Sequence, residues 1–120
     1  MNILTVDDSR MMRQMLMMTL SSAGHNVYQA ADGVEGLEVL GEHLGFELII
    51  TDINMPRLDG FGLIERVRAL PQYCATPILV LSTESSDAKK ARARAAGASG
   101  WIVKPFNSEK LLNAVRRVAG

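Results

Sequence analysis

Leu48-Ile49-Ile50-Thr51, residues 48–51, is a short apolar and β-branched run that ends against a carboxylate, Asp52. A run of this length favours a buried strand, because helices of globular proteins usually need ten or more residues. Four similar runs occur elsewhere, and the one at 27–30 is the weakest. The sequence therefore predicts five short strands, at residues 3–6, 27–30, 48–51, 77–81 and 101–103.

Longer segments with apolar residues at three- and four-residue spacing separate these runs, and this spacing is typical of helices with one buried face. Gly24 and Gly97 are expected to end the first and fourth helices, and Ser108 is expected to be the N-cap of the last. The predicted helices cover residues 10–23, 33–43, 59–70, 86–96 and 108–118. Strict alternation of strand and helix predicts an α/β fold, a doubly wound parallel sheet covered on both faces. Five units are too few for an eight-stranded barrel.

Length and composition indicate one ordinary soluble globular domain. The chain has 120 residues, of which 48% are hydrophobic and 22% charged, and its mean hydropathy is +0.09. No apolar run exceeds four residues, so no membrane span is predicted, and no secretory signal or interdomain linker is visible. A single cysteine, Cys74, cannot form an internal disulfide and is interpreted as incidental. These features predict a cytoplasmic protein with one domain, residues 1–120.

Charge is balanced overall but unevenly distributed. The net charge is zero, which does not favour nucleic-acid binding. Residues 1–60 hold nine acidic and three basic residues, whereas residues 61–120 hold four acidic and ten basic ones. An acidic half suits a hard cation, and a basic half suits phosphate or an acidic partner.

Polar side chains follow four of the five predicted strands. The residues at these strand ends are the Asp7-Asp8 pair, Asp52, Ser82-Thr83-Glu84 and Lys104. In parallel open sheets, ligands bind outside the carboxyl ends of the strands, where the strand order reverses. Three carboxylates packed together repel each other, and Mg²⁺ would relieve that repulsion with oxygen ligands. Zinc is not favoured, because no cysteine or histidine stands near these residues.

A cation beside a carboxylate, an ammonium and a hydroxyl is suited to holding a phosphoryl group. One of the carboxylates would then be available as a nucleophile. The glycine-rich phosphate loops are absent, as are Ser/His/Asp and Cys/His catalytic sets. The strand ends therefore predict phosphoryl chemistry on a carboxylate.

The same residues resemble the receiver domain of two-component response regulators, in particular the single-domain regulators of chemotaxis. The resemblance covers essentially all 120 residues, and the motifs in this order are specific. They are Val6-Asp7-Asp8-Ser9, Thr51-Asp52-Ile53-Asn54-Met55-Pro56-Arg57-Leu58-Asp59-Gly60, Leu81-Ser82-Thr83-Glu84, and Gly97-Ala98-Ser99-Gly100-Trp101-Ile102-Val103-Lys104-Pro105-Phe106. The resemblance implies a flavodoxin-like (βα)5 fold with strand order 2-1-3-4-5.

The resemblance also implies a role for each matching site residue. Asp52 would accept a phosphoryl group from a phosphohistidine of a histidine kinase, while Ser82 acts as the switch hydroxyl and Lys104 contacts the phosphoryl group. The Lys104-Pro105 bond would be a cis peptide that presents the ammonium to the site. The implied Mg²⁺ ligands are Asp7, Asp8, Asp52 and the backbone carbonyl of Asn54.

Trp101 stands at the position of the family's switch aromatic, which is usually Tyr, Phe or His. Because Trp is bulkier and carries an N–H in place of a hydroxyl, its full burial in the active state is not expected. Asn54 and Glu84 would flank the path of an attacking water and so control dephosphorylation. In the methionine-rich segment, Met12 and Met15 fit a core-facing stripe. Met11 and Met18 are predicted to be exposed and are interpreted as incidental, with contact to a kinase or phosphatase as the alternative.

The sequence thus predicts a receiver domain with no output domain, whose phosphorylation at Asp52 switches its binding to another protein. The expected partners are a histidine kinase of the chemotaxis type, the flagellar motor switch and a phosphatase. The chain is expected to be a monomer and to catalyse only its own phosphorylation and dephosphorylation.

Three alternatives stay open at this point. A phosphorelay intermediate or phosphate sink would exchange the phosphoryl group with a histidine phosphotransferase. A Mg²⁺-dependent aspartyl-phosphate phosphatase would need a second acid two residues after its nucleophile, where this chain has Asn54. A flavin-binding module would need a hydroxyl-rich phosphate loop after the first strand, where Asp7 and Asp8 would repel phosphate.

Overall fold

The computed structural model describes residues 1–120 and contains one five-stranded parallel sheet in the order β2-β1-β3-β4-β5. The fold class and strand order predicted from the sequence are both confirmed. The elements are β1 (Asn2–Val6), α1 (Arg10–Ser22), β2 (Asn26–Ala30), α2 (Gly33–Glu42), β3 (Leu48–Thr51), α3 (Gly60–Arg68), the 3-10 helix η1 (Pro71–Tyr73), β4 (Ile78–Ser82), α4 (Asp87–Ala96), β5 (Gly100–Val103) and α5 (Ser108–Ala119).

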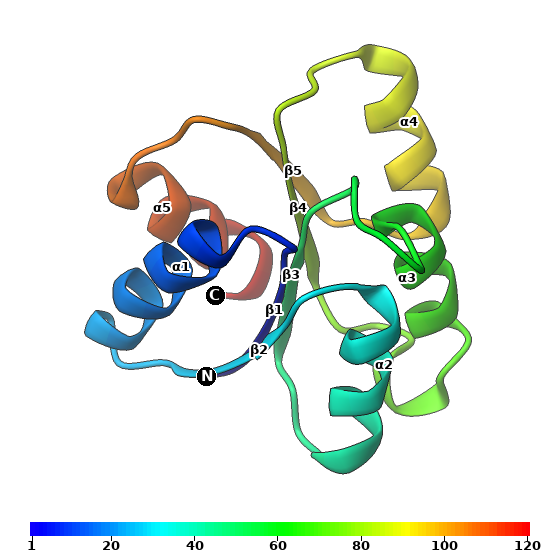
Figure 1. Cartoon of the computed structure of the whole chain (residues 1–120), viewed down its shortest axis with the longest axis horizontal. Coiled ribbons are helices and arrows are strands. Elements are labelled where there is room, and N and C mark those ends of the chain that lie inside the picture. Colours follow the sequence, from blue (N-terminus) through cyan, green and yellow to red (C-terminus); the bar gives the residue numbers. More distant parts are fainter.

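Helices cover both faces of the sheet. In Figure 1 the sheet is seen nearly edge-on, with α1 and α5 on one side and α2, α3 and α4 on the other. Two apolar clusters fill the spaces between these layers, one on each side. The central strands β3 and β4 are buried along their whole length, as is usual for parallel strands with two covered faces. The edge strand β2 alternates between exposed and half-buried residues before ending at the buried Ala30.

Strand register aligns the carboxyl ends of the strands. Val6 pairs with Thr51, so Asp7 and Asp52 leave neighbouring strands side by side. Ser82 pairs with Val103, which brings Lys104 next to the end of β4, where the Lys104 N–H donates to the Ser82 carbonyl at 2.7 Å. The Lys104-Pro105 peptide bond is cis, as predicted. Residues far apart in the chain therefore meet at one edge of the sheet.

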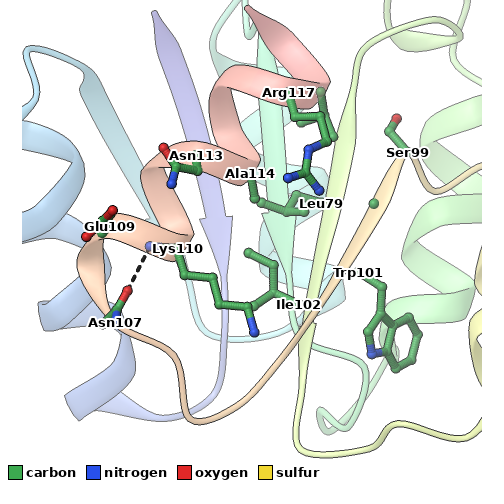
Figure 2. Close-up of a pocket in the computed structure, with 12 residues that line it drawn as sticks. Leu79, Ser99, Trp101, Ile102, Asn107, Glu109, Lys110, Asn113, Ala114 and Arg117 are labelled. Atoms are coloured by element: carbon green, nitrogen blue, oxygen red, sulfur yellow. Dashed lines mark hydrogen bonds between the residues drawn. The ribbon is translucent and has the colours of Figure 1, made fainter.

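Each of the five α-helices begins at a side-chain cap, and the last one differs from the prediction. The Asn107 side chain accepts a hydrogen bond from the Lys110 N–H at 2.8 Å, drawn as a dashed line in Figure 2. Ser108 is therefore the first residue of α5 and not its N-cap. Asn is as good a cap as Ser, so the type of residue alone did not distinguish these neighbours. The Gly24 and Gly97 helix ends are confirmed, and both glycines have positive φ.

Two further sequence predictions can be compared with the structure. Met11 and Met18 are exposed, at 81% and 70%, and Met12 packs against the α1–α5 side of the core. Met15 is only half-buried. The 3-10 turn at η1 was not predicted; it brings Tyr73 into the core and leaves Cys74 exposed. No helix is long and apolar enough to cross a membrane.

Candidate phosphoryl and metal site

Three carboxylates meet at the carboxyl edge of the sheet. Asp7 follows β1 and is only 1% exposed, Asp8 is exposed and Asp52 is half-buried. Each of the three residues offers an oxygen that lies within 4.8 Å of the oxygens from the other two. Carboxylate oxygens at this separation suit a hard divalent cation. The acidic cluster predicted from the strand ends is therefore present and could bind a metal.

Lys104 bridges two of these carboxylates. Its Nζ atom donates to Asp7 Oδ2 at 3.0 Å and to Asp52 Oδ2 at 3.1 Å. Burial disfavours the ammonium, but the hydrogen bond to Asp7 and the charges of Asp52 and Asp7 hold the pKa of Lys104 above its ordinary value. One ammonium compensates only part of the charge of three carboxylates, so the pocket keeps a negative balance that attracts a cation.

Backbone donors orient the remaining oxygens of Asp7 and Asp52. The Ser9 N–H donates to Asp7 Oδ1 at 2.9 Å, and the Ile53 N–H donates to Asp52 Oδ1 at 2.6 Å. Each carboxylate thus has one oxygen tied to its own loop and the other directed at Lys104. This arrangement fixes both groups in rotation before any ligand arrives, which is the preorganisation that electrostatic catalysis requires.

Ser82 ends β4 and is fully buried. Its Oγ accepts a hydrogen bond from the Glu84 N–H at 3.1 Å, which leaves the hydroxyl proton available for another acceptor. The carboxylate of Glu84 forms an ion pair with Lys89 of α4. Asn54 lies in the β3–α3 loop, two residues after Asp52, and is exposed. The predicted dephosphorylation residues thus lie on two different loops.

Trp101 is half-buried on β5, and its indole N–H donates to the carbonyl of Glu84 at 3.0 Å. The indole packs against the side of the core formed by α2, α3 and α4. In Figure 2 it projects from β5 on the side away from α5, opposite to Ile102. The indole N–H of Trp101 therefore joins β5 to the β4–α4 loop.

An ion pair at the rim of the site was missed by the sequence analysis. Arg57, in the β3–α3 loop, makes two hydrogen bonds to Asp32, which follows β2. The sequence analysis found nothing reactive after β2. The spacing of Asp32 and Glu35 at the start of α2 is a helix-capping signal that would have placed Asp32. Nothing near Arg57 in the sequence indicates its partner, 25 residues away.

Comparison with known proteins agrees with this geometry. The family model described as "Response regulator receiver domain" matches residues 3–116. The chain belongs to this family, so the predicted resemblance is confirmed.

Within the family, the chain is a receiver domain like those of the CheY chemotaxis response regulators, which is consistent with phosphorylation-switched signalling. It is 38% identical to the "Chemotaxis protein CheY homolog" of Campylobacter jejuni, over the whole of this chain and 93% of that protein. It is also 38% identical to "Chemotaxis protein CheY1" of Helicobacter pylori, over the whole chain and 98% of that protein.

Solved structures give the same result. The chemotaxis protein CheY4 of Vibrio cholerae is 49% identical, with a TM-score of 0.94 over 98% of this chain and 97% of that one. The receiver domain of the sensor histidine kinase PA1611 from Pseudomonas aeruginosa is 26% identical, with a TM-score of 0.89 over 99% of this chain and 97% of that one. That structure is described as holding a magnesium ion coordinated in its active site cleft.

Proposed function

We propose that Asp52 accepts a phosphoryl group from a phosphohistidine of a histidine kinase, and that the phosphorylated protein then binds a protein target. The observation that carries this proposal is the double hydrogen bond of Lys104 to Asp7 and Asp52 within the acidic cluster. Asp52 is the carboxylate that follows the central strand β3 and contacts the ammonium. Asp7 contacts it as well, but is 1% exposed and therefore less accessible to a donor.

Mg²⁺ fits the oxygen donors of this cluster. Asp7, Asp8, Asp52 and the carbonyl of Asn54 would hold it, and the bound ion would neutralise charge on the phosphoryl oxygens. The magnesium ion described for the PA1611 receiver domain supports this choice of metal. Lys104 would neutralise the negative charge of the phosphoryl group that the metal leaves uncompensated, because its ammonium already lies within hydrogen-bond distance of Asp52.

The transfer itself requires little from the protein beyond position and charge. A carboxylate oxygen of Asp52 forms a bond to phosphorus as the phosphorus–nitrogen bond to the donor imidazole breaks, and the nitrogen keeps the electron pair. We expect Ser82 to donate its hydroxyl proton to a phosphoryl oxygen; in support, its Oγ accepts a hydrogen bond from the Glu84 N–H, which leaves the proton available. Hydrolysis later breaks the phosphoryl bond to Asp52 when water attacks phosphorus, on a path flanked by Asn54 and Glu84. The chain would thus catalyse only its own phosphorylation and dephosphorylation.

The target we propose is the flagellar motor switch, since the named relatives are chemotaxis proteins. The hollow between β5 and α5 is a candidate docking place (Figure 2). Its lining includes the basic side chains of Lys110 and Arg117 and the acidic side chain of Glu109, so it carries a net positive charge. An acidic partner segment would suit that lining. The proposal places the protein in the cytoplasm, where the exposed thiol of Cys74 persists unpaired.

A labelling experiment tests the acceptor. The wild type should take up label from a phosphohistidine donor, while Asp52→Asn should take up none and EDTA should block labelling of the wild type. Undiminished labelling of Asp52→Asn would refute the assignment. A pull-down of both proteins with and without acetyl phosphate then identifies the partner. Capture of a motor component supports the proposed target, whereas capture of a histidine phosphotransferase alone would replace it with a phosphorelay role.

A further inference from the structure

The β3–α3 loop is joined to the β2–α2 loop by a two-point ion pair. Arg57 Nε donates to Asp32 Oδ2 at 2.7 Å, and Arg57 Nη2 donates to Asp32 Oδ1 at 3.0 Å. The fork of the guanidinium matches the two oxygens of the carboxylate, so the contact fixes direction as well as distance. The Arg57 side chain is 55% exposed, so the two parallel hydrogen bonds, and not burial of the guanidinium, fix its orientation.

The Asp32 end of the pair is firmly anchored. Asp32 is 7% exposed and caps α2, where its Oδ1 also accepts from the Glu35 N–H at 2.8 Å. The hydrogen bonds from Arg57 and Glu35 hold the pKa of Asp32 below its ordinary value. The carboxylate is therefore charged at neutral pH and fixed to the start of a helix.

The Arg57 end lies in a strained backbone. Arg57 has φ = 66° and is the only non-glycine residue with positive φ. A residue with a β-carbon keeps this conformation only where its surroundings impose it. The loops also meet through their backbones, because the Gly33 N–H donates to the Leu58 carbonyl at 3.2 Å. A β-carbon at Gly33 would lie 2.5 Å from that carbonyl oxygen, so the fit leaves no room for a side chain.

The segment held in this way is the one that carries Asn54. It begins at Asp52 and is closed by a hydrogen bond from the Gly60 N–H to the Ile53 carbonyl at 2.8 Å. Asn54 itself is exposed, and the packing of its own side chain does little to set its place. The conformation of the loop therefore determines where the carbonyl of Asn54 lies relative to Asp52.

We propose that Asp32 and Arg57 are positioning residues for the metal site, which hold the β3–α3 loop so that Asn54 stays in place beside Asp52. This inference rests on the proposed function, in which the Asn54 carbonyl is a Mg²⁺ ligand. Neither residue touches the reacting atoms. Their effect reaches the site through the backbone of residues 53–57.

The direction of the effect separates positioning from simple charge. Removing the positive charge of Arg57 should strengthen Mg²⁺ binding if charge alone acts, and removing the negative charge of Asp32 should weaken it. Positioning predicts that both substitutions weaken binding. A purely structural role predicts that both lower the free energy of unfolding and leave the affinity for Mg²⁺ unchanged.

Two substitutions remove the pair with little other damage. Arg57→Gly tolerates the positive φ, and Asp32→Asn keeps a good N-cap for α2. Arg57→Lys keeps one charged donor but loses the fork. Arg66→Ala, at an exposed position of α3, is the matched control because it removes the same charge without breaking the pair.

The dissociation constant for Mg²⁺ should be measured by titration followed through backbone amide chemical shifts. We expect Arg57→Gly and Asp32→Asn each to raise it about tenfold, at the low end of what residues supporting metal ligands contribute. The double variant should be no weaker than either single one, because the pair acts as a unit. The dissociation constant of Arg57→Lys should lie between those of the wild type and Arg57→Gly, and that of Arg66→Ala should equal the wild-type value. The amide shifts of Asn54 and Met55 should move in the metal-free variants, and saturating Mg²⁺ should restore the labelling rate with acetyl phosphate.

Opposite changes in the two single variants would replace positioning with electrostatics. Unchanged Mg²⁺ affinity in both, with normal affinity in the wild type, would overturn the inference while leaving the proposed function intact. A wild type that binds no Mg²⁺ and takes up no phosphoryl group would instead refute the proposed function itself.

Discussion

Lys104 connects the two carboxylates that matter most for the proposed chemistry. Its ammonium reaches Asp7 and Asp52, which lie 97 and 52 residues earlier in the chain. Burial alone would lower its pKa, but the Asp7 hydrogen bond and the charge of Asp52 outweigh burial and raise it. The side chain therefore remains charged at physiological pH and would be available to the phosphoryl group that we propose for Asp52.

Stability should depend on pH through Lys104 in a defined direction. Because its folded-state pKa is raised, the stabilisation is complete below the ordinary lysine pKa of about 10.4 and is lost as the pH rises through the higher folded value. The free energy of unfolding of the wild type, minus that of Lys104→Met, should be constant from pH 7 to 9 and should decrease above about pH 10. Urea unfolding of both proteins at each pH measures this difference, and a difference that increases above pH 10 would contradict the assignment.

A second prediction concerns the hydrogen bond that the Trp101 indole N–H donates to the Glu84 carbonyl. Trp101→Phe keeps an aromatic ring but loses the N–H that donates to Glu84. We expect amide exchange at Glu84 and Ser85 to become faster, and the free energy of unfolding to fall by about 1 kcal/mol for the lost hydrogen bond. Trp101→Tyr serves as the comparison, because its hydroxyl offers a donor at a different position. Unchanged exchange in Trp101→Phe would show that the indole N–H does not hold the β4–α4 loop.

At the scale of elements, helix caps and strand register bring the site together. Ser9 caps α1 and Asp32 caps α2, and each lies in a loop at the carboxyl edge of the sheet. Parallel pairing of Val6 with Thr51 sets Asp7 beside Asp52. A one-residue shift in this register would turn the side chains of β3 to the opposite face. Packing on both faces of β3 holds this register, and the register in turn fixes the positions of Asp7 and Asp52.

The cap of α5 gives a prediction at this scale. Asn107→Ala should lower the free energy of unfolding by about 1 kcal/mol, because the Lys110 N–H loses its acceptor. Ser108→Ala should change it by less than about 0.5 kcal/mol, since Ser108 is exposed within the first turn. Urea unfolding of the two variants decides between the caps. A larger loss for Ser108→Ala would favour the original sequence prediction.

At the scale of the whole molecule, the site forms where two oppositely charged halves of the chain meet. The acidic first half supplies Asp7, Asp8 and Asp52, and the basic second half supplies Lys104. The order β2-β1-β3-β4-β5 makes this possible, because β3 lies at the centre with β1 on one side and β4 and β5 on the other. A divalent cation bound here would therefore stabilise contacts between segments that are distant in the sequence.

Mg²⁺ should stabilise the folded protein as a whole. At a free concentration one hundred times its dissociation constant, it should raise the free energy of unfolding by about 2.7 kcal/mol. Asp8→Asn should lose most of this effect, because Asp8 belongs to the acidic cluster but does not bond Lys104. The control is NaCl at matched ionic strength, and equal stabilisation by both salts would show that screening, not binding, is responsible.

The sequence by itself determined the fold class, the element order and the residues of the acidic cluster. Apolar runs of strand length and helical periodicity are local signals, so they can be read without knowing what packs where. The rule that parallel strands present their carboxyl ends at one edge then placed Asp7, Asp52, Ser82 and Lys104 together. The strand order came from the resemblance and not from the pattern, because periodicity does not say which strands are neighbours.

Only the tertiary structure decided how these residues are held. The Arg57–Asp32 pair, the double hydrogen bond of Lys104 and the Trp101 N–H bonded to Glu84 all join segments that the sequence keeps apart. The choice of Asn107 over Ser108 as a cap depended on which side chain turned toward the helix. Such contacts depend on side-chain direction and on loop conformation, such as the positive φ of Arg57. The surrounding structure imposes that conformation, whereas local propensity disfavours it.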